Sequence, residues 1–210
     1  MKQAILKSAF AALALAFAAQ AMADQVTPVS YTFDQPTSCG SWCYHDPSFS
    51  KLTDGVIGNA GWAHNAGAEW AGWVWQPVVN IDFSFAAQKH FTSVAVGSTQ
   101  DSLGDVALPS FDLWAKEGNQ WVLKATIDNP ASNANNNDPY SGAAHPFYTF
   151  SNLNFNSDQV RVTARANGPW TFVDEVVFQA TPVPEPESWA MMLGGLALLG
   201  LVHRKRKAAK

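Results

Sequence analysis

Apolar and polar residues alternate along several stretches in the middle of the chain. In the stretch 78–85, every second residue from Val79 onward is Val, Ile or Phe, and the residues between them are Asn, Asp and Ser. A period of two is typical of a strand with one buried face. The sequence therefore predicts strands at 31–33, 78–85, 91–96, 110–115, 121–127, 147–150, 160–164 and 172–178.

Turn-forming residues separate these stretches. They include Asp54-Gly55, Gly104-Asp105 and an Asn-rich run at 129–142. Gly, Asn and Asp favour turns because they tolerate positive φ or bond to their own backbone. No stretch between 24 and 181 shows a convincing amphipathic helix pattern. About eight short strands joined by such turns predict an all-β domain, an antiparallel β-sandwich of the jelly-roll kind.

The first 23 residues have the organisation of a signal peptide. Lys2 and Lys7 precede an apolar run at 9–19, and Ala21 and Ala23 supply the small residues that signal peptidase reads. We therefore expect a signal helix at 1–23 and a mature chain that begins at Asp24.

The last 29 residues have three parts in a fixed order. Pro184, Glu185 and Pro186 come first, an uncharged apolar run at 189–202 follows, and a basic tail at 203–210 closes the chain. As a helix, the apolar run would be roughly 21 Å long, shorter than the ~30 Å hydrocarbon core, so it predicts a marginal transmembrane helix. A permanent short anchor and a buried core helix are the alternatives. The basic residues would stay on the cytoplasmic side; they include Arg204, Lys205 and Arg206.

This order resembles the PEP-CTERM sorting signal of Gram-negative bacteria. The resemblance covers only the tail, 182–210. It implies that the protein is exported, is held transiently in the inner membrane, and is cut by the membrane protease exosortase before it reaches the cell surface or the extracellular space. The remaining 158 residues, 24–181, form one domain of ordinary size.

The charge of this domain narrows the classes of partner. It carries 15 acidic and 6 basic residues, a formal net charge of −9. That charge argues against nucleic acid as a partner. It suits a soluble exported domain and leaves divalent cations as possible ligands.

Cys39 and Cys43 are the only cysteines. In an exported protein, two cysteines in one short loop predict a local disulfide, which would shape the loop that carries Trp42 and Tyr44. A metal site with His45 is the weaker alternative, because the spacing matches no familiar zinc pattern.

A second resemblance spans nearly the whole domain. The motifs that carry it are, in order, KLTDG at 51–55, Trp62, VVNIDFSF at 78–85, VAV at 94–96, FDLWAKEGNQWVL at 111–123, QVRVTAR at 159–165 and FVDEVVF at 172–178. This order is similar to that of galactose-binding-like β-sandwiches, the group that contains discoidin domains and many bacterial carbohydrate-binding modules.

Members of that superfamily often hold a structural calcium between the Asp-Gly loop and an acidic residue of the last strand. Carried over to this chain, the resemblance implies Asp54 and Glu175 as ligands, with backbone carbonyls around Lys51 and Asn59. Calcium accepts such a mixture of carboxylate and carbonyl oxygens. The alternative is that Asp54-Gly55 is only a tight turn and Glu175 only a solvated strand end.

Tryptophan is unusually frequent, with eight of the nine Trp in the domain. Flat aromatic faces suit the apolar faces of sugar rings, but Trp also fills cores. Trp73 and Trp75, which share strand parity, and Trp62 are expected in the core. The expected ligand contacts lie in Gly- and Ala-rich loops and are Trp42, Trp70, His64 and Glu69.

Catalysis has little support in the sequence. The acidic residues are scattered among turns, and neither an HExxH nor a GxSxG motif is present. We therefore expect a non-catalytic module that binds exopolysaccharide. The alternative is a structural surface or matrix protein with no discrete ligand.

Overall fold

The computed structural model describes residues 23–41, 43–128, 136–183 and residue 195. The predicted signal peptide up to residue 22, Trp42, and the sorting tail from Pro184 onward, apart from Gly195, lie outside this part. Two short 3₁₀ helices are η1 (Lys51–Thr53) and η2 (His64–Gly67). The strands are β1 (Asp24–Val26), β2 (Ser30–Phe33), β3 (Ala71–Val74), β4 (Val78–Gly97), β5 (Gln100–Asp101), β6 (Ser110–Glu117), β7 (Gln120–Ile127), β8 (Asn136–Asn137), β9 (Phe147–Phe150), β10 (Phe155–Arg165), β11 (Trp170–Val173) and β12 (Val176–Pro182).

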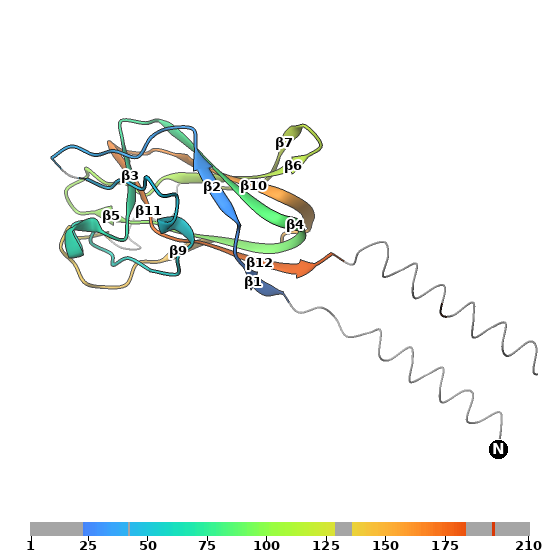
Figure 1. Cartoon of the computed structure of the whole chain (residues 1–210). Helices are drawn as coiled ribbons and strands as arrows, with labels where there is room; N and C mark the ends of the chain where they lie inside the picture. Colours follow the sequence, from blue (N-terminus) through green and yellow to red (C-terminus); the bar gives the residue numbers. More distant parts are fainter. Residues whose placement is uncertain (1–22, 42, 129–135, 184–194, 196–210) are drawn as a thin grey trace, which may run out of the picture.

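Strand β4 joins the two layers of an antiparallel β-sandwich, the predicted fold class (Figure 1). Its first half pairs with β2 on one side and with β10 on the other, and β6 and β7 extend that layer. Its second half pairs with β12 and β9, and β1 adds to β12. Between the halves, residues 86–88 are exposed, which marks the bend where the strand passes from one layer to the other.

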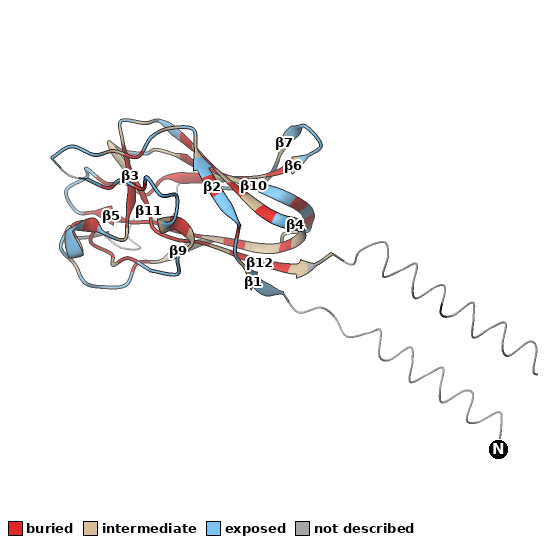
Figure 2. Ribbon diagram, viewed as in Figure 1, coloured by how far each residue is buried: buried red, intermediate tan, exposed pale blue. Residues whose placement is uncertain are grey.

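The main core fills the space between these layers. Alternate residues of the first half of β4 point inward, as the sequence predicted, and Val79, Ile81 and Phe83 are fully buried. Phe83 meets Phe178 of β12 with ring centroids 4.9 Å apart. Figure 2 shows buried residues along the inner faces of both layers. The alternating pattern therefore determined which face of each strand is buried.

A two-stranded ribbon of β3 and β11 closes one end of the sandwich. One face of the ribbon belongs to the main core and carries Ala71, Trp73 and Val173. The other face carries Phe172, whose ring lies against Gly72. A Cβ added at Gly72 would lie 2.4 Å from that ring, so only glycine permits the contact.

The outward face of the ribbon supports a second hydrophobic cluster, which we call the outer aromatic cluster. Its fully buried members are Tyr44, Trp70, Val106 and Phe172, and the half-buried Trp62 and Trp170 pack against them. Because a ribbon has two faces, one pair of strands separates two apolar clusters.

Several strand predictions differ from the structure in their bounds. The stretches 78–85 and 91–96 are one strand, β4, since the chain bends without leaving the ladder. The stretch 172–178 is two strands, interrupted at Asp174 and Glu175. The strands β1, β5 and β8 were not predicted, because two or three residues show no clear period, and β3 was indicated only by the shared parity of Trp73 and Trp75.

Trp75 is a wrong prediction, because its side chain is 76% exposed instead of buried in the core. β3 ends at Val74, and Trp75 takes a φ of 57°, which breaks the alternation. Its N–H donates to the carbonyl of Pro169 at 2.8 Å. Trp73, which shares its parity in the sequence, is fully buried as predicted.

The two ends of the domain lie side by side. Asp24 of β1 pairs with Ala180 of β12, so the chain enters and leaves at one edge of the sandwich. Figure 1 shows this edge on the opposite side of the domain from β3, β5 and β11. The ribbon and the outer aromatic cluster therefore lie far from the chain ends.

Candidate functional sites

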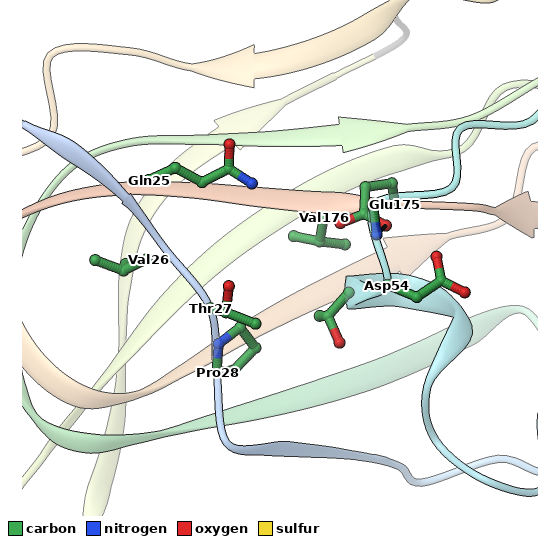
Figure 3. A pocket seen from close by; sticks show the side chains of 9 residues that line it. Gln25, Val26, Thr27, Pro28, Asp54, Glu175 and Val176 are labelled. Atoms are coloured by element: carbon green, nitrogen blue, oxygen red, sulfur yellow. Dashed lines mark hydrogen bonds between the residues drawn. The ribbon is translucent and has the colours of Figure 1, made fainter.

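An acidic pocket of about 230 Å³ lies where the loop after η1 meets the start of β12. Figure 3 shows the side chains of Asp54 and Glu175 on these two segments, with the segment 25–28 beside them. Both residues line the pocket. Two segments that are 120 residues apart in the chain therefore meet at this point, as the calcium prediction requires.

Glu175 is the most perturbed acid of this pocket. The side chain is buried, and its Oε2 accepts a hydrogen bond from the N–H of Gly55 at 3.1 Å. Gly55 has a φ of 79°, a conformation that favours glycine and that allows its N–H to reach the carboxylate. Burial, with smaller contributions from the charges of Asp54 and Asp174, raises the pKa of Glu175 to about 7.

The acidic pocket fits a calcium ion in part. Two carboxylates that repel one another gain from a cation between them, and calcium prefers hard oxygen ligands. Lys51 and Asn59, the other predicted contributors, do not line the pocket. The amine of Lys51 donates to the carbonyl of Trp70 at 3.0 Å, and the amide nitrogen of Asn59 lies 2.9 Å from a ring nitrogen of His64.

Thr53 and Gln25 line the acidic pocket and were not predicted. Within the described ranges, no three His, Cys, Asp or Glu side chains come together as a metal site. A calcium ion here would therefore need backbone carbonyls or water to complete its six to eight ligands.

A buried ion pair lies behind the acidic pocket. The Nε2 atom of His145 is 2.6 Å from Oδ2 of Asp174, and both side chains are fully buried. The same oxygen accepts the N–H of Gly58 at 2.7 Å. Burial lowers the pKa of His145, but the hydrogen bond and charge of Asp174 raise it more, so the net shift is upward. The pair therefore fixes the loop at 58 against β12.

An aromatic pocket of about 90 Å³ opens into the outer aromatic cluster. The planes of Trp62 and Phe172 are nearly parallel with centroids 5.9 Å apart, and Trp170 is parallel to Phe172 at 5.4 Å. Tyr44 meets all three rings edge-on. The lining residues are Tyr44, Trp62, Asp105, Val106, Trp170 and Phe172.

The hydroxyl of Tyr44 makes no hydrogen bond with any described residue, although the side chain is only 1% exposed. A buried hydroxyl without a partner costs free energy, roughly 1–3 kcal/mol. Burial, with a smaller contribution from Tyr140, raises the pKa of Tyr44, so the group stays a neutral phenol.

Asp101 supports the aromatic pocket from behind. Its Oδ2 accepts a hydrogen bond from the indole N–H of Trp62 at 2.9 Å. Its Oδ1 accepts the backbone N–H groups of Leu103 and Gly104 at 3.1 and 2.8 Å. The buried carboxylate thus orients Trp62 and shapes the loop that leads to Asp105.

The expected ligand contacts do not form one site. Trp42 lies outside the described residues. The prediction for Trp70 is wrong in one respect, since the indole is fully buried and presents no face to a ligand. It fills the space between Phe172 and His145, with centroids at 6.2 and 5.0 Å. The indole also lies against Gly58, where an added Cβ would be 2.8 Å from the ring.

His64 and Glu69 lie together near the surface, beside η2. Oε1 of Glu69 accepts a hydrogen bond from the side-chain amide of Asn65 at 2.6 Å. Asn65 and Ala66 have φ values of 50° and 53°, an uncommon conformation for residues with a Cβ. Neither His64 nor Glu69 lines the acidic or the aromatic pocket.

The sequence analysis missed Tyr44, Trp170 and Asp105 as pocket residues and assigned Trp62 to the core. The available signal was the position of Tyr44 directly after the disulfide loop. The structure joins Cys39 and Cys43 in a disulfide, with Cα atoms 4.0 Å apart. The bridge holds the short turn that delivers Tyr44 to the cluster.

Comparison with known families identifies the tail. Residues 182–207 match the PEP-CTERM protein-sorting motif, as the sequence predicted. No curated protein matches the chain. In the described part of the chain, no helix has the length and apolar character needed to span a bilayer, and the apolar run 189–202 falls outside that part except for Gly195.

Comparison with solved structures supports the predicted fold class, an antiparallel β-sandwich. The C-terminal domain of a chitobiase from Bacteroides fragilis aligns with a TM-score of 0.52 at 8% identity, over 77% of this chain and 100% of that domain. The family 32 module of NanJ from C. perfringens, in complex with galactose, has a TM-score of 0.48 at 12% identity, over 75% and 99%. The family 32 module of AlyQ, in complex with 4,5-unsaturated mannuronic acid, has a TM-score of 0.47 at 13% identity, over 74% of this chain and 97% of that module.

Proposed function

We propose that this protein is an exported, exosortase-sorted surface protein that binds a polysaccharide through the aromatic pocket without catalysis. The observation that carries the proposal is the open pocket lined by Tyr44, Trp62 and Trp170, with the acidic Asp105 in the same lining. The fold and the sorting motif are consistent with such a role.

The chemistry of the pocket suits a sugar. Indole and phenol rings offer apolar faces to the C–H side of a pyranose, and a phenol hydroxyl can donate to a sugar oxygen. The small volume, about 90 Å³, favours the end or one ring of a glycan over an enclosed oligosaccharide. The edge of a polysaccharide chain is a ligand of this kind.

The position of the pocket suits display at a cell surface. Both chain ends leave the domain at the edge formed by β1 and β12, on the opposite side from the ribbon that carries the pocket (Figure 1). While the tail is held in the inner membrane, the pocket faces away from it. After exosortase processing, the same geometry presents the pocket to an extracellular exopolysaccharide.

A structural calcium at the acidic pocket is part of this proposal. Asp54 and Glu175 would hold it through carboxylate oxygens and so tie the loop after η1 to the last strand. The raised pKa of Glu175 supports the idea, because a desolvated carboxylate beside another carboxylate is stabilised by a cation.

The hydrogen bonds that Asp101 accepts within the protein support a non-catalytic role. Glycoside hydrolysis needs two carboxylates facing the scissile bond. Asp101 is 5% exposed, and both of its oxygens accept hydrogen bonds from Trp62 and the loop at 103–104. Asp105 is therefore the one carboxylate among the described residues that line the pocket, and no second carboxylate faces it across a bound glycan.

A structural matrix protein is the second candidate function. It is favoured by the full burial of Trp70 and Trp73, since tryptophan that fills cores leaves fewer faces for ligands. This candidate predicts no saturable response to any glycan.

Titration of glycans into the full chain in detergent micelles tests the proposed function. Binding to a panel of bacterial exopolysaccharides is measured by calorimetry and tryptophan fluorescence. We expect saturable binding to at least one glycan and its loss in Trp170→Ala. Trp121→Ala is the control, because Trp121 lies on β7, outside the pocket and beneath Arg161. No binding to any glycan would favour the matrix protein.

A further inference from the structure

The charges around the aromatic pocket all have one sign. Asp105 is the only charged residue among those that line it, and the carboxylate of Asp101 lies directly behind the indole of Trp62. A carboxylate near a partly desolvated cavity favours a cation there and opposes an anion. The domain as a whole carries a formal charge of −9, which adds to the same bias.

The basic residues of the domain lie elsewhere. Arg161 and Arg165 make ion pairs with Asp82 and Asp112 on the first layer. Lys116 and Arg161 cover the ring of Trp121. None of the six lines the aromatic pocket, so no cation there could pair with an acidic ligand. The six are Lys51, Lys89, Lys116, Lys124, Arg161 and Arg165.

The uncharged lining favours a cation as well. Aromatic faces attract cations through the ring quadrupole, most strongly for Trp and Tyr. The acidic residues at the pocket, the lack of basic residues in its lining and its aromatic rings therefore point to one ligand charge.

We infer that the aromatic pocket recognises a hexosamine with a free, protonated amine, in preference to its N-acetylated form and to uronic acids. The inference rests on the proposed function and specifies its ligand class. The sugar ring packs against Trp62 and Trp170, and the ammonium group lies towards Asp105 and Tyr44. A partly deacetylated amino-sugar polymer is the corresponding class of exopolysaccharide.

Calorimetric titration of the full chain in detergent micelles tests this inference. The probes are a glucosamine trimer, an N-acetylglucosamine trimer and a mannuronate trimer, each at pH 6 and low ionic strength. We expect the glucosamine trimer to bind about tenfold more tightly than the N-acetylated trimer, a difference of about 1.4 kcal/mol, and the mannuronate trimer to bind more weakly still. Raising the salt concentration should reduce the preference.

Two charge-neutralising variants make the test specific. Asp105→Asn should lose most of the preference for the free amine while it still binds the N-acetylated trimer. Asp158→Asn removes the same charge at an exposed site on β10 and should keep the preference. Raising the pH until the amine of the sugar is neutral should have the same effect on the wild-type chain as Asp105→Asn.

The outcomes separate the inference from the proposed function. Equal or tighter binding of the N-acetylated or mannuronate trimer would overturn the inference and leave the carbohydrate-binding function standing. An amine preference that survives in Asp105→Asn would also overturn it. If the wild-type chain binds none of the trimers and no glycan of the wider panel, the proposed function itself is contradicted, and the inference falls with it.

Discussion

The main core and the outer aromatic cluster each bury a tyrosine, Tyr31 and Tyr44, and the two hydroxyls differ in their hydrogen bonds. In the main core, the hydroxyl of Tyr31 donates to Asp46 and accepts the N–H of Leu52 at 3.0 Å. In the outer aromatic cluster, Tyr44 Oη and Trp70 Nε1 are buried without a hydrogen-bond partner among the described residues. Only the outer cluster opens into a described aromatic pocket.

This difference separates packing from recognition. A buried polar atom that is satisfied within the protein stabilises the fold, whereas one left unsatisfied costs stability unless a ligand completes it. The ribbon of β3 and β11 allows both, because its inward face is sealed by two layers and its outward face is covered only by loops. Four changes test this comparison.

The largest expected effect is the loss of a ring from the main core. Phe83→Ala should lower the free energy of unfolding by about 3–5 kcal/mol, because Phe83 is fully buried and a cavity would remain. Trp170→Ala, in the half-buried rim of the outer cluster, should cost clearly less. Urea unfolding followed by circular dichroism measures both. Equal losses would show that the two clusters contribute alike to stability.

Calcium should have the next largest effect. If the acidic pocket binds calcium, a concentration about 100 times the dissociation constant should stabilise the fold by about 2.7 kcal/mol relative to chelator. Thermal melts of the wild-type chain and of Glu175→Gln provide the measurement. Asp158→Asn serves as the control and should respond like the wild type. A melting temperature that does not respond to calcium would remove the ion from the proposal.

A matched pair of tyrosine substitutions compares the clusters directly. Tyr31→Phe should destabilise the fold by about 1–3 kcal/mol, because Asp46 and the N–H of Leu52 both lose a partner. Tyr44→Phe should leave stability unchanged or slightly raised, because no described residue loses a hydrogen-bond partner. Urea midpoints measure the two effects. A large destabilisation by Tyr44→Phe would mean that its hydroxyl is satisfied in solution.

The fourth expected effect is the pH dependence that Glu175 contributes without calcium. Its pKa is raised to about 7 from an ordinary 4.5, so the folded state holds the proton more tightly than the unfolded state does. Stability should therefore fall as the pH rises from about 4.5 to about 7 and then level off. The difference between wild type and Glu175→Gln isolates this contribution in urea titrations at several pH values. A wild-type stability that rises relative to that of Glu175→Gln between pH 4.5 and pH 7 would contradict the sign.

Long strands were predicted well and short ones were not. The alternation from Val79 to Phe85 is strong because one face of β4 meets the main core throughout. Trp73 and Trp75 carry the same sequence signal, yet only Trp73 is buried, because the strand ends between them and φ turns positive. A local pattern cannot show where the ladder of hydrogen bonds stops.

The two sites were predictable to different degrees. Asp54 and Glu175 were named through a resemblance that preserves the order of motifs, and the structure places both at the acidic pocket. The aromatic pocket was not identified, since Tyr44, Trp62, Asp105 and Trp170 come from four separate segments. The exposure of an aromatic ring depends on what packs over it. Trp70, for example, is buried between Phe172 and His145.

The sequence by itself determined the sorting motif, the sandwich class and the inward faces of the long strands. These properties rest on local composition and on a period of two, which each segment carries alone. The tertiary structure decided which loops meet, which tryptophans are covered, and which polar atoms lack partners. These properties depend on contacts between segments up to about 130 residues apart, such as Tyr44 with Phe172, and no local pattern encodes them.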